Sequence, residues 1–319
     1  MGGACRARYE IMGRSYAGDG RTQSGACHLG EREWRLADAT GATHAWYRLC
    51  RLTCVMSHEV KREVSCRGER SCWSNMTGRS ELDLQRVEQD TLQRTQRECA
   101  EAVNLAKRAL DHLNDGLNLM PDKWAVPDAR EGLILQLSAL GYDSLRWAFE
   151  ISVKGYYLQA YALIRQGWES WLHAAYLHVY RDRPVDEWRN FRTRPKPTAM
   201  RKAVAARSSA TGASNDEFAE AMDDIADAYA GFAHPSAESV RLTLGTRGDD
   251  LWLRRGGEFD TGHFLRIVNF FCLTAYLLST MMIILLPEET ATDYRRRVDQ
   301  LHDDLAAWRT EPPPDSTGN

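Results

Sequence analysis

The sequence predicts an all-α protein, a multi-helix bundle around a central hydrophobic helix, with one small β-hairpin near residues 240–254. Three observations support this fold class. Apolar residues recur at three- and four-residue steps through most of residues 80–309, which is the spacing of amphipathic helices. Residues 267–286 carry no charge, so they need a buried environment. Alternation of apolar and polar residues, the pattern of a strand, is convincing around residues 240–254 alone.

The overall composition is that of a soluble globular protein. The chain has 319 residues, and its 41 Lys and Arg nearly balance its 44 Asp and Glu. A body of this size can bury a large core without metals or disulfides. The balanced charge gives no strong nucleic-acid signal, because nucleic-acid binders usually carry a marked basic excess. With 43% hydrophobic and 27% charged residues, a multi-span membrane protein and a wholly disordered chain are also excluded.

Composition divides the chain into three parts. These are a poorly ordered Cys- and Arg-rich extension over residues 1–75, a helical-bundle domain over 76–309 and a disordered tail over 310–319. The extension sustains no apolar period that could build a core. We favour the interpretation that it is either a disordered extension or translated from a wrongly assigned start, in which case Met56 or Met76 is the true first residue.

Six of the eight cysteines lie in this extension. Zinc is one interpretation, since soft ligands follow one another there: Cys50, Cys54, His58, Cys66 and Cys72. Structural zinc sites usually present two ligand pairs, each two to four residues apart, and a single pair fits here. We therefore predict no metal and no cofactor. The first residues lack the apolar segment of a secretory signal, which argues for reduced thiols and a cytoplasmic protein.

The first predicted helix is long and amphipathic and runs from Glu81 to about Leu117. Ser80 is suited to cap its N-terminus, with Asp83 reaching back in the manner of a capping box. Two prolines then interrupt the chain before a second helix, which we expect over residues 130–154.

The second helix shows an apolar face and a charged row. The apolar face, which we expect to enter the core, comprises Leu133, Leu137, Leu140, Trp147 and Ile151. The charged row, at i,i+3 and i,i+4 spacing, comprises Asp143, Arg146, Glu150 and Lys154. Such spacing predicts ion pairs along the helix, each contributing a few tenths of a kcal/mol.

The remaining elements follow from the same periodicity. The third helix, over residues 156–181, has a wide apolar stripe rich in tryptophan. The chain then turns basic and later rich in small residues over 192–215, which indicates a short helix followed by a flexible loop. Further helices are expected over 215–232, 267–286 and 288–308.

The hydrophobic helix over residues 267–286 is long enough to cross a bilayer, so a single-span membrane anchor is an alternative. A helix that is apolar all round also suits the centre of a soluble bundle. We favour the bundle, because the other helices carry apolar faces that would lose their shared partner if this helix entered the lipid.

A polar row on the third helix is the candidate functional site. Arg165, Glu169 and His173 follow one another at four-residue steps and therefore share one face. If the row points inward, the carboxylate can set the tautomer of the imidazole or raise its pKa, and the guanidinium can hold an anionic ligand. The alternative is a solvent-facing ion pair that contributes little.

A His-Pro-Ser turn adds two candidate residues, His234 and Ser236. Ser236 is placed to cap the turn that follows, so the alternative here is a purely structural turn.

Motifs of familiar enzyme chemistry are missing: the sequence has no phosphate-binding glycine loop, nucleophile elbow or zinc-protease motif. An Arg and a His separated by four to six residues mark one superfamily of small helical ribonucleases, and Arg297 and His302, with four residues between them, have this spacing. In such a pair, Arg stabilises phosphate and His acts as general acid or base. The spacing arises readily by chance in so Arg-rich a chain, so a metal-independent ribonuclease is an alternative only.

The segment YYLQAYALIRQGWESWLHAAYL is followed about fifty residues later by YAGFAHPS, a short hairpin and a hydrophobic helix. This order resembles a bacterial all-helical family, domain of unknown function 5677, over about residues 81–286. Its motif positions here are Ala162, Leu163, Arg165, Glu169, His234, Pro235 and Ser236. The resemblance implies a soluble bundle in which the Arg and Glu of the third helix face the His-Pro turn, and it implies no established activity.

These patterns together predict a non-catalytic helical module of a bacterial cytoplasm. We expect it to bind a protein partner or a small anionic ligand at the polar row, and we do not expect it to be an enzyme.

Overall fold

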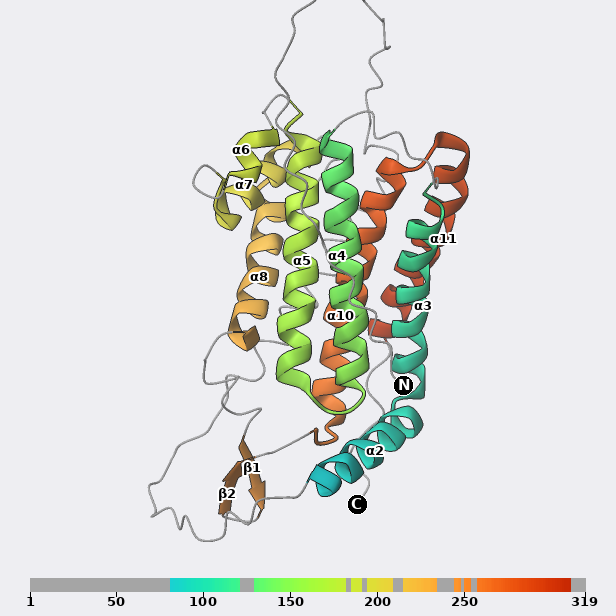
Figure 1. Ribbon diagram of the computed structural model, residues 1–319, viewed down its shortest axis with the longest axis vertical. Helices are drawn as coiled ribbons and strands as arrows, with labels where there is room; N and C mark the ends of the chain where they lie inside the picture. Colours follow the sequence, from blue (N-terminus) through green and yellow to red (C-terminus); the bar gives the residue numbers. More distant parts are fainter. Residues whose placement is uncertain are drawn as a thin grey trace, which may run out of the picture. The chain divides into compact units, whose positions relative to one another are not determined.

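The computed structural model describes residues 81–120, 129–181, 185–190, 194–208, 215–233, 244–247, 250–253 and 257–310, all within one compact unit (Figure 1). The predictions made for the extension over residues 1–75 and for the tail beyond Thr310 lie outside these described residues, as does the predicted cap Ser80.

Most of the described residues are helical, which confirms the predicted all-α class. The helices are α2 (Glu81–Glu98), α3 (Ala100–Asn118), α4 (Ala129–Ser152), α5 (Tyr157–Val179), α6 (Val185–Arg189), α7 (Pro197–Ser208), α8 (Asn215–Ala233), α10 (Thr261–Leu285) and α11 (Glu288–Thr310). Strands β1 (Leu244–Arg247) and β2 (Asp250–Leu253) pair antiparallel, with Leu244 opposite Leu253. The turn between them lies outside the described residues, so the complete hairpin over 240–254 stays a prediction.

The single long helix predicted from Glu81 to Leu117 is wrong, because the chain bends at Cys99. This residue has φ −123° and ψ 32°, and it separates α2 from α3. The two helices have different partners. Thr91 of α2 donates its hydroxyl hydrogen to the carbonyl of Gly257, whereas α3 packs on α10, α4 and α11. Figure 1 shows α2 turned away from the axis of α3.

Helices α4 and α5 form an antiparallel pair, and glycines allow them to pack closely on each other and on α10. Gly155 in the connecting turn has φ 85°, a conformation that other residues rarely adopt. A Cβ added to Gly141 would lie 2.7 Å from the Leu278 side chain, and one added to Gly167 would lie 3.3 Å from the Thr274 methyl. The sequence thus places glycine where the three helices come closest.

The face of α4 that enters the core differs from the apolar face predicted from its sequence. Its buried residues are mostly small: Arg130, Ile134, Ser138, Gly141, Ser144, Leu145, Ala148 and Ser152. Leu140 and Trp147 of the predicted face are 45% and 57% exposed, so the prediction is wrong for these two residues. The close approach of α5 requires small side chains, and the larger ones on α4 are left on the flank.

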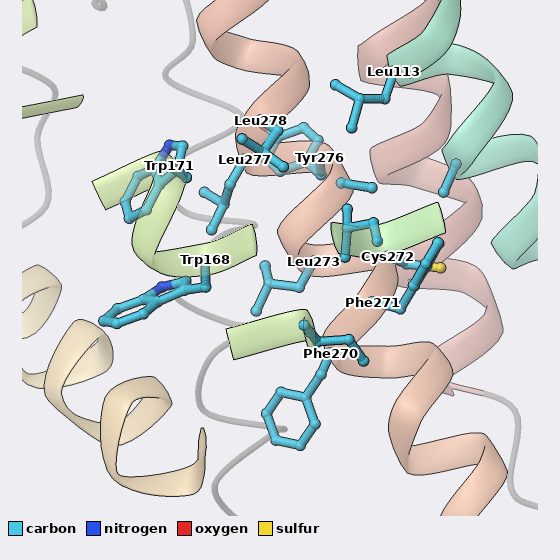
Figure 2. Packing of buried hydrophobic residues seen from close by; sticks show 14 of the residues in the cluster. Leu113, Trp168, Trp171, Phe270, Phe271, Cys272, Leu273, Tyr276, Leu277 and Leu278 are labelled. Carbon is cyan, nitrogen blue, oxygen red and sulfur yellow. The ribbon is translucent and has the colours of Figure 1, made fainter. Parts of the chain in front are cut away.

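Helix α10 is the hydrophobic helix, and it begins earlier than predicted. Asp260 caps it by accepting a hydrogen bond from the backbone N–H of His263 at 2.8 Å. Most of the helix is buried against α3, α4, α5 and α11, and Figure 2 shows its Phe270, Leu273 and other apolar side chains in this packing. A large apolar side chain buried in this way stabilises the fold by about 1.5–3 kcal/mol. The core of the described body is therefore organised around α10.

Helices α7 and α8 cover another side of α5 (Figure 1). Their buried side chains are Met200, Val204, Ala205, Met222, Ile225 and Tyr229. An ion pair of 2.6 Å between Arg201 and Asp223 joins the two helices. The Tyr229 hydroxyl shares a 2.7 Å hydrogen bond with the hydroxyl of Thr274 on α10. Helix α5 therefore contacts both α4 and this layer.

Candidate functional site

The first two residues of the polar row form an ion pair along α5. Arg165 donates from Nε to Oε1 of Glu169 at 2.8 Å, and the two side chains are 27% and 38% exposed. The four-residue spacing places the second side chain one turn above the first, as the sequence predicts. Since both groups remain partly in water, the pair contributes at most about 1 kcal/mol to stability. Its charges are held near the surface, where a ligand could reach them.

His173, one turn further along α5, is held by a residue that the sequence did not single out. The indole Nε1–H of Trp188 on α6 donates to His173 Nδ1 at 3.0 Å, and the two rings pack edge to face with centroids 5.5 Å apart. Because Nδ1 accepts this hydrogen bond, the neutral imidazole carries its proton on Nε2. The expectation that Glu169 sets the tautomer is therefore wrong: Trp188 sets it.

The surroundings of His173 keep the imidazole neutral. Burial, followed by the positive charge of Arg194, lowers the pKa of His173 to about 4, while Glu169 acts in the opposite direction. Glu169 thus acts on the pKa of the imidazole in the direction that the sequence predicts, but desolvation of the ring outweighs the carboxylate one turn away, and the net shift is downward. At neutral pH the ring presents an Nε2–H donor and no free lone pair, so it cannot serve as a general base.

Arg194 completes the site from the segment between α6 and α7. Its guanidinium carbon lies 5.9 Å from the centroid of the Trp188 ring. The Trp188 indole therefore contacts the imidazole through its N–H and the guanidinium through its face, an arrangement favoured by the ring quadrupole. We call Arg165, Glu169, His173, Trp188 and Arg194 the α5–α6 cluster. It holds two cations, one carboxylate and one neutral N–H donor, which is a set suited to binding an anion.

Two of the predicted site residues lie outside the described residues. These are His234 and Ser236 of the turn after α8. Whether the Arg and Glu of α5 face the His-Pro turn, as the family resemblance implies, is therefore still a prediction.

The ribonuclease pair is not brought together on α11. Arg297 forms a 2.8 Å ion pair with Asp115 of α3. The His302 side chain is only 10% exposed, and its ring packs on Tyr276 of α10 with centroids 5.4 Å apart. Residues five positions apart on a helix point about 140° away from each other. A single phosphate between the two side chains is incompatible with this geometry.

The described part of the chain contains no group of three or more His, Cys, Asp or Glu side chains placed to hold a metal ion. Its two cysteines, Cys99 and Cys272, are buried and form no disulfide, and burial raises the pKa of the Cys99 thiol. The Cys- and His-containing segment over residues 50–72 lies outside the described residues.

Comparison of the chain with protein-family models, with curated proteins and with solved structures found no match. The resemblance to domain of unknown function 5677 therefore stays a prediction from the motifs quoted above.

Proposed function

We propose that the protein is a non-catalytic helical module that binds an anionic group, either a small ligand or the acidic side chain of a partner protein, at the α5–α6 cluster. The observation that carries the proposal is the hydrogen bond from Trp188 to His173. It occupies the one lone pair of the imidazole and leaves the Nε2–H as a donor close to the positive charge of Arg194. A charge-assisted hydrogen bond to an anion is the interaction that such donors favour.

The bonding of His173 and Glu169, the two candidate bases among the described residues of the α5–α6 cluster, supports binding at this cluster. His173 has no acceptor left, and Glu169 is engaged by Arg165. General acid–base chemistry needs a group that can exchange a proton near neutral pH, and the pKa of about 4 for His173 is unsuited to that role.

The test follows the Trp188 indole ¹H–¹⁵N signal of the ¹⁵N-labelled full chain while inorganic phosphate or acetate is added. A Trp188→Phe variant identifies the signal. We expect a saturable shift of that signal, and we expect Arg165→Gln or Arg194→Gln to weaken the apparent affinity about tenfold, as loss of one charge-assisted hydrogen bond implies.

Arg189→Gln provides the matched control, because Arg189 is next to Trp188 on α6 but lies outside the cluster, with its guanidinium paired with Asp186. A shift that never saturates, or one that Arg189→Gln alters as much as Arg194→Gln does, rules out the proposed site.

We also propose that the protein is soluble and cytoplasmic and that it belongs with the bacterial family that it resembles. By length and composition α10 could cross a membrane, but most of it is buried against other helices of the chain. Recovery of the protein in the soluble cell fraction without detergent is the expected result. Recovery only with detergent would favour the alternative that α10 is a membrane anchor.

The ribonuclease alternative draws no support from the geometry of Arg297 and His302. It predicts that purified protein cuts mixed RNA without metal and that His302→Ala abolishes cutting. If the purified wild-type protein leaves the RNA intact, the ribonuclease alternative is excluded.

A further inference from the structure

The flank of α4 carries two apolar side chains that the fold leaves exposed. Leu140 is 45% exposed and Trp147 is 57% exposed. They are seven residues apart, so they lie on the same side of the helix. Within the described residues, Leu119 is the only other large apolar side chain that is exposed, and it is much less so than Trp147. Exposed apolar surface of this kind often marks an interaction site.

A row of charged residues lies beside these two side chains. Asp143, Arg146, Glu150 and Lys154 were expected to form ion pairs along α4, yet none of them does so with any described residue. Arg146 instead lies with its guanidinium carbon 5.8 Å from the centroid of the neighbouring Trp147 ring. Asp143, Arg146 and Glu150 are exposed next to this tryptophan, and Lys154, in the turn that follows α4, is half-buried.

The row is complementary to itself. Read along the chain, its signs are negative, positive, negative and positive, and read in reverse every position has the opposite sign. When two α4 helices pair antiparallel about an axis next to Trp147, at the level of Ala148, Arg146 lies opposite Glu150 of the second copy, and Glu150 lies opposite its Arg146. Asp143 then lies toward the end of the second helix, where Lys154 follows in the turn after Ser152.

We propose that this face of α4 is a two-fold interface between two copies of the chain. The order of the charges favours a second copy over an unrelated partner, because an isologous interface is the case in which a surface must complement itself. Trp147 and Arg146 are residue types that concentrate binding energy near the centre of interfaces, and here both lie close to the two-fold axis.

The interface is small. Stable dimers bury about 800 Å² per partner, which one helix face does not reach without help from the neighbouring α5. The dimer is therefore weak, with a dissociation constant on the order of micromolar, and its ion pairs make it sensitive to salt.

Sedimentation equilibrium of the full chain over a range of concentrations tests the proposal. Arg146→Glu places a carboxylate opposite Glu150 of the second copy, and we expect the dissociation constant to rise about tenfold or more from like-charge repulsion. Glu150→Arg should do the same, because it places a guanidinium opposite Arg146. The double variant Arg146→Glu, Glu150→Arg restores opposite charges at both positions and should dimerise like the wild type.

Mixing the two single variants is the most specific test. In an antiparallel pair of the two, positions 146 and 150 carry opposite charges at both contacts. We expect a heterodimer from two chains that each remain monomeric alone. Arg296→Glu on α11 changes the net charge by the same amount at a side chain that is 79% exposed, and it should leave the dissociation constant unchanged.

Three results would overturn the proposal. They are a chain that stays monomeric at every concentration, a dimer that Arg146→Glu leaves intact, and a double variant that dimerises no better than the single ones. Circular dichroism of each variant checks that the exposed substitutions leave the helices folded. A monomeric wild-type chain would leave the face open to a partner of another kind.

Discussion

The Trp188 indole on α6 donates a 3.0 Å hydrogen bond to Nδ1 of His173 on α5. This contact joins the helix that carries the polar row to the segment that carries Arg194. It also determines which nitrogen of the imidazole can bind a ligand. The chemistry of the candidate site therefore depends on a residue fifteen positions away from the row.

Trp188→Phe should raise the pKa of His173 from about 4 toward its ordinary value of 6.5. The hydrogen bond stabilises the neutral imidazole, and its loss corresponds to about 1 kcal/mol, or roughly one pH unit. Burial and Arg194 still act on the ring, so the pKa should stay below 6.5. The chemical shift of the His173 Cε1–H proton, followed against pH, measures the change. An unaltered pKa would show that the hydrogen bond does not hold the ring neutral.

The stability of the protein should fall as the pH is lowered from about 6.5 to about 4. Burial, followed by nearby arginines, lowers the pKa of both His173 and His178 to about 4, from an ordinary value of 6.5 in the unfolded chain. Between these pH values the unfolded state binds more protons than the folded state, so the free energy of unfolding rises with pH. The stabilisation is complete above about 6.5 and absent below about 4.

Urea unfolding at several pH values measures this effect, which is on the order of 3 kcal/mol for each histidine. His178→Asn should flatten the pH dependence, whereas Arg296→Gln on the exposed side of α11 should not. A variant without His178 that keeps the full pH dependence would contradict the assignment.

Gly116→Ala should destabilise the protein by about 1–3 kcal/mol, because overpacking a close helix contact forces neighbouring groups apart. The added Cβ would lie 2.7 Å from Cζ of Tyr294, a fully buried ring whose hydroxyl donates to the carbonyl of His112 at 2.9 Å. The ring cannot move without breaking that hydrogen bond. Thermal unfolding measures the loss of stability.

Gly231→Ala on α8 is the matched control. An added Cβ there meets no atom within 4 Å, so the higher helix propensity of alanine should stabilise the protein by about 0.5–1 kcal/mol. If Gly116→Ala did not destabilise the protein more than Gly231→Ala, that result would contradict the close contact of Gly116 on α3 with Tyr294 on α11.

Periodicity predicted the helices and the polar row, because both depend on residues that are near each other in the sequence. The Arg165–Glu169 pair lies one helical turn apart, and its spacing is visible in the chain itself. The all-α class follows from the same kind of local information.

Other features depend on tertiary contacts that the sequence pattern does not encode. The bend at Cys99 arises because α2 and α3 have different partners, although their apolar spacing is continuous. Trp147 is exposed because α5 packs closely on α4, and this packing requires the face of α4 that carries small residues to enter the core. Trp188 stands out in the sequence as a single tryptophan in a polar stretch. Its contact with His173 cannot be predicted from that, because the contact depends on how the chain turns between α5 and α6.

Most of α10 is buried among the other helices, and we propose that it is the core helix of a water-soluble bundle. Amide hydrogen exchange of the full chain in detergent-free buffer tests this proposal. We predict that the α10 amides, particularly from Phe270 to Leu278, exchange only through global unfolding and are among the slowest in the protein. Fast exchange of α10 while α4 and α5 stay protected would contradict the proposal, because the apolar helix would then lie outside the folded body.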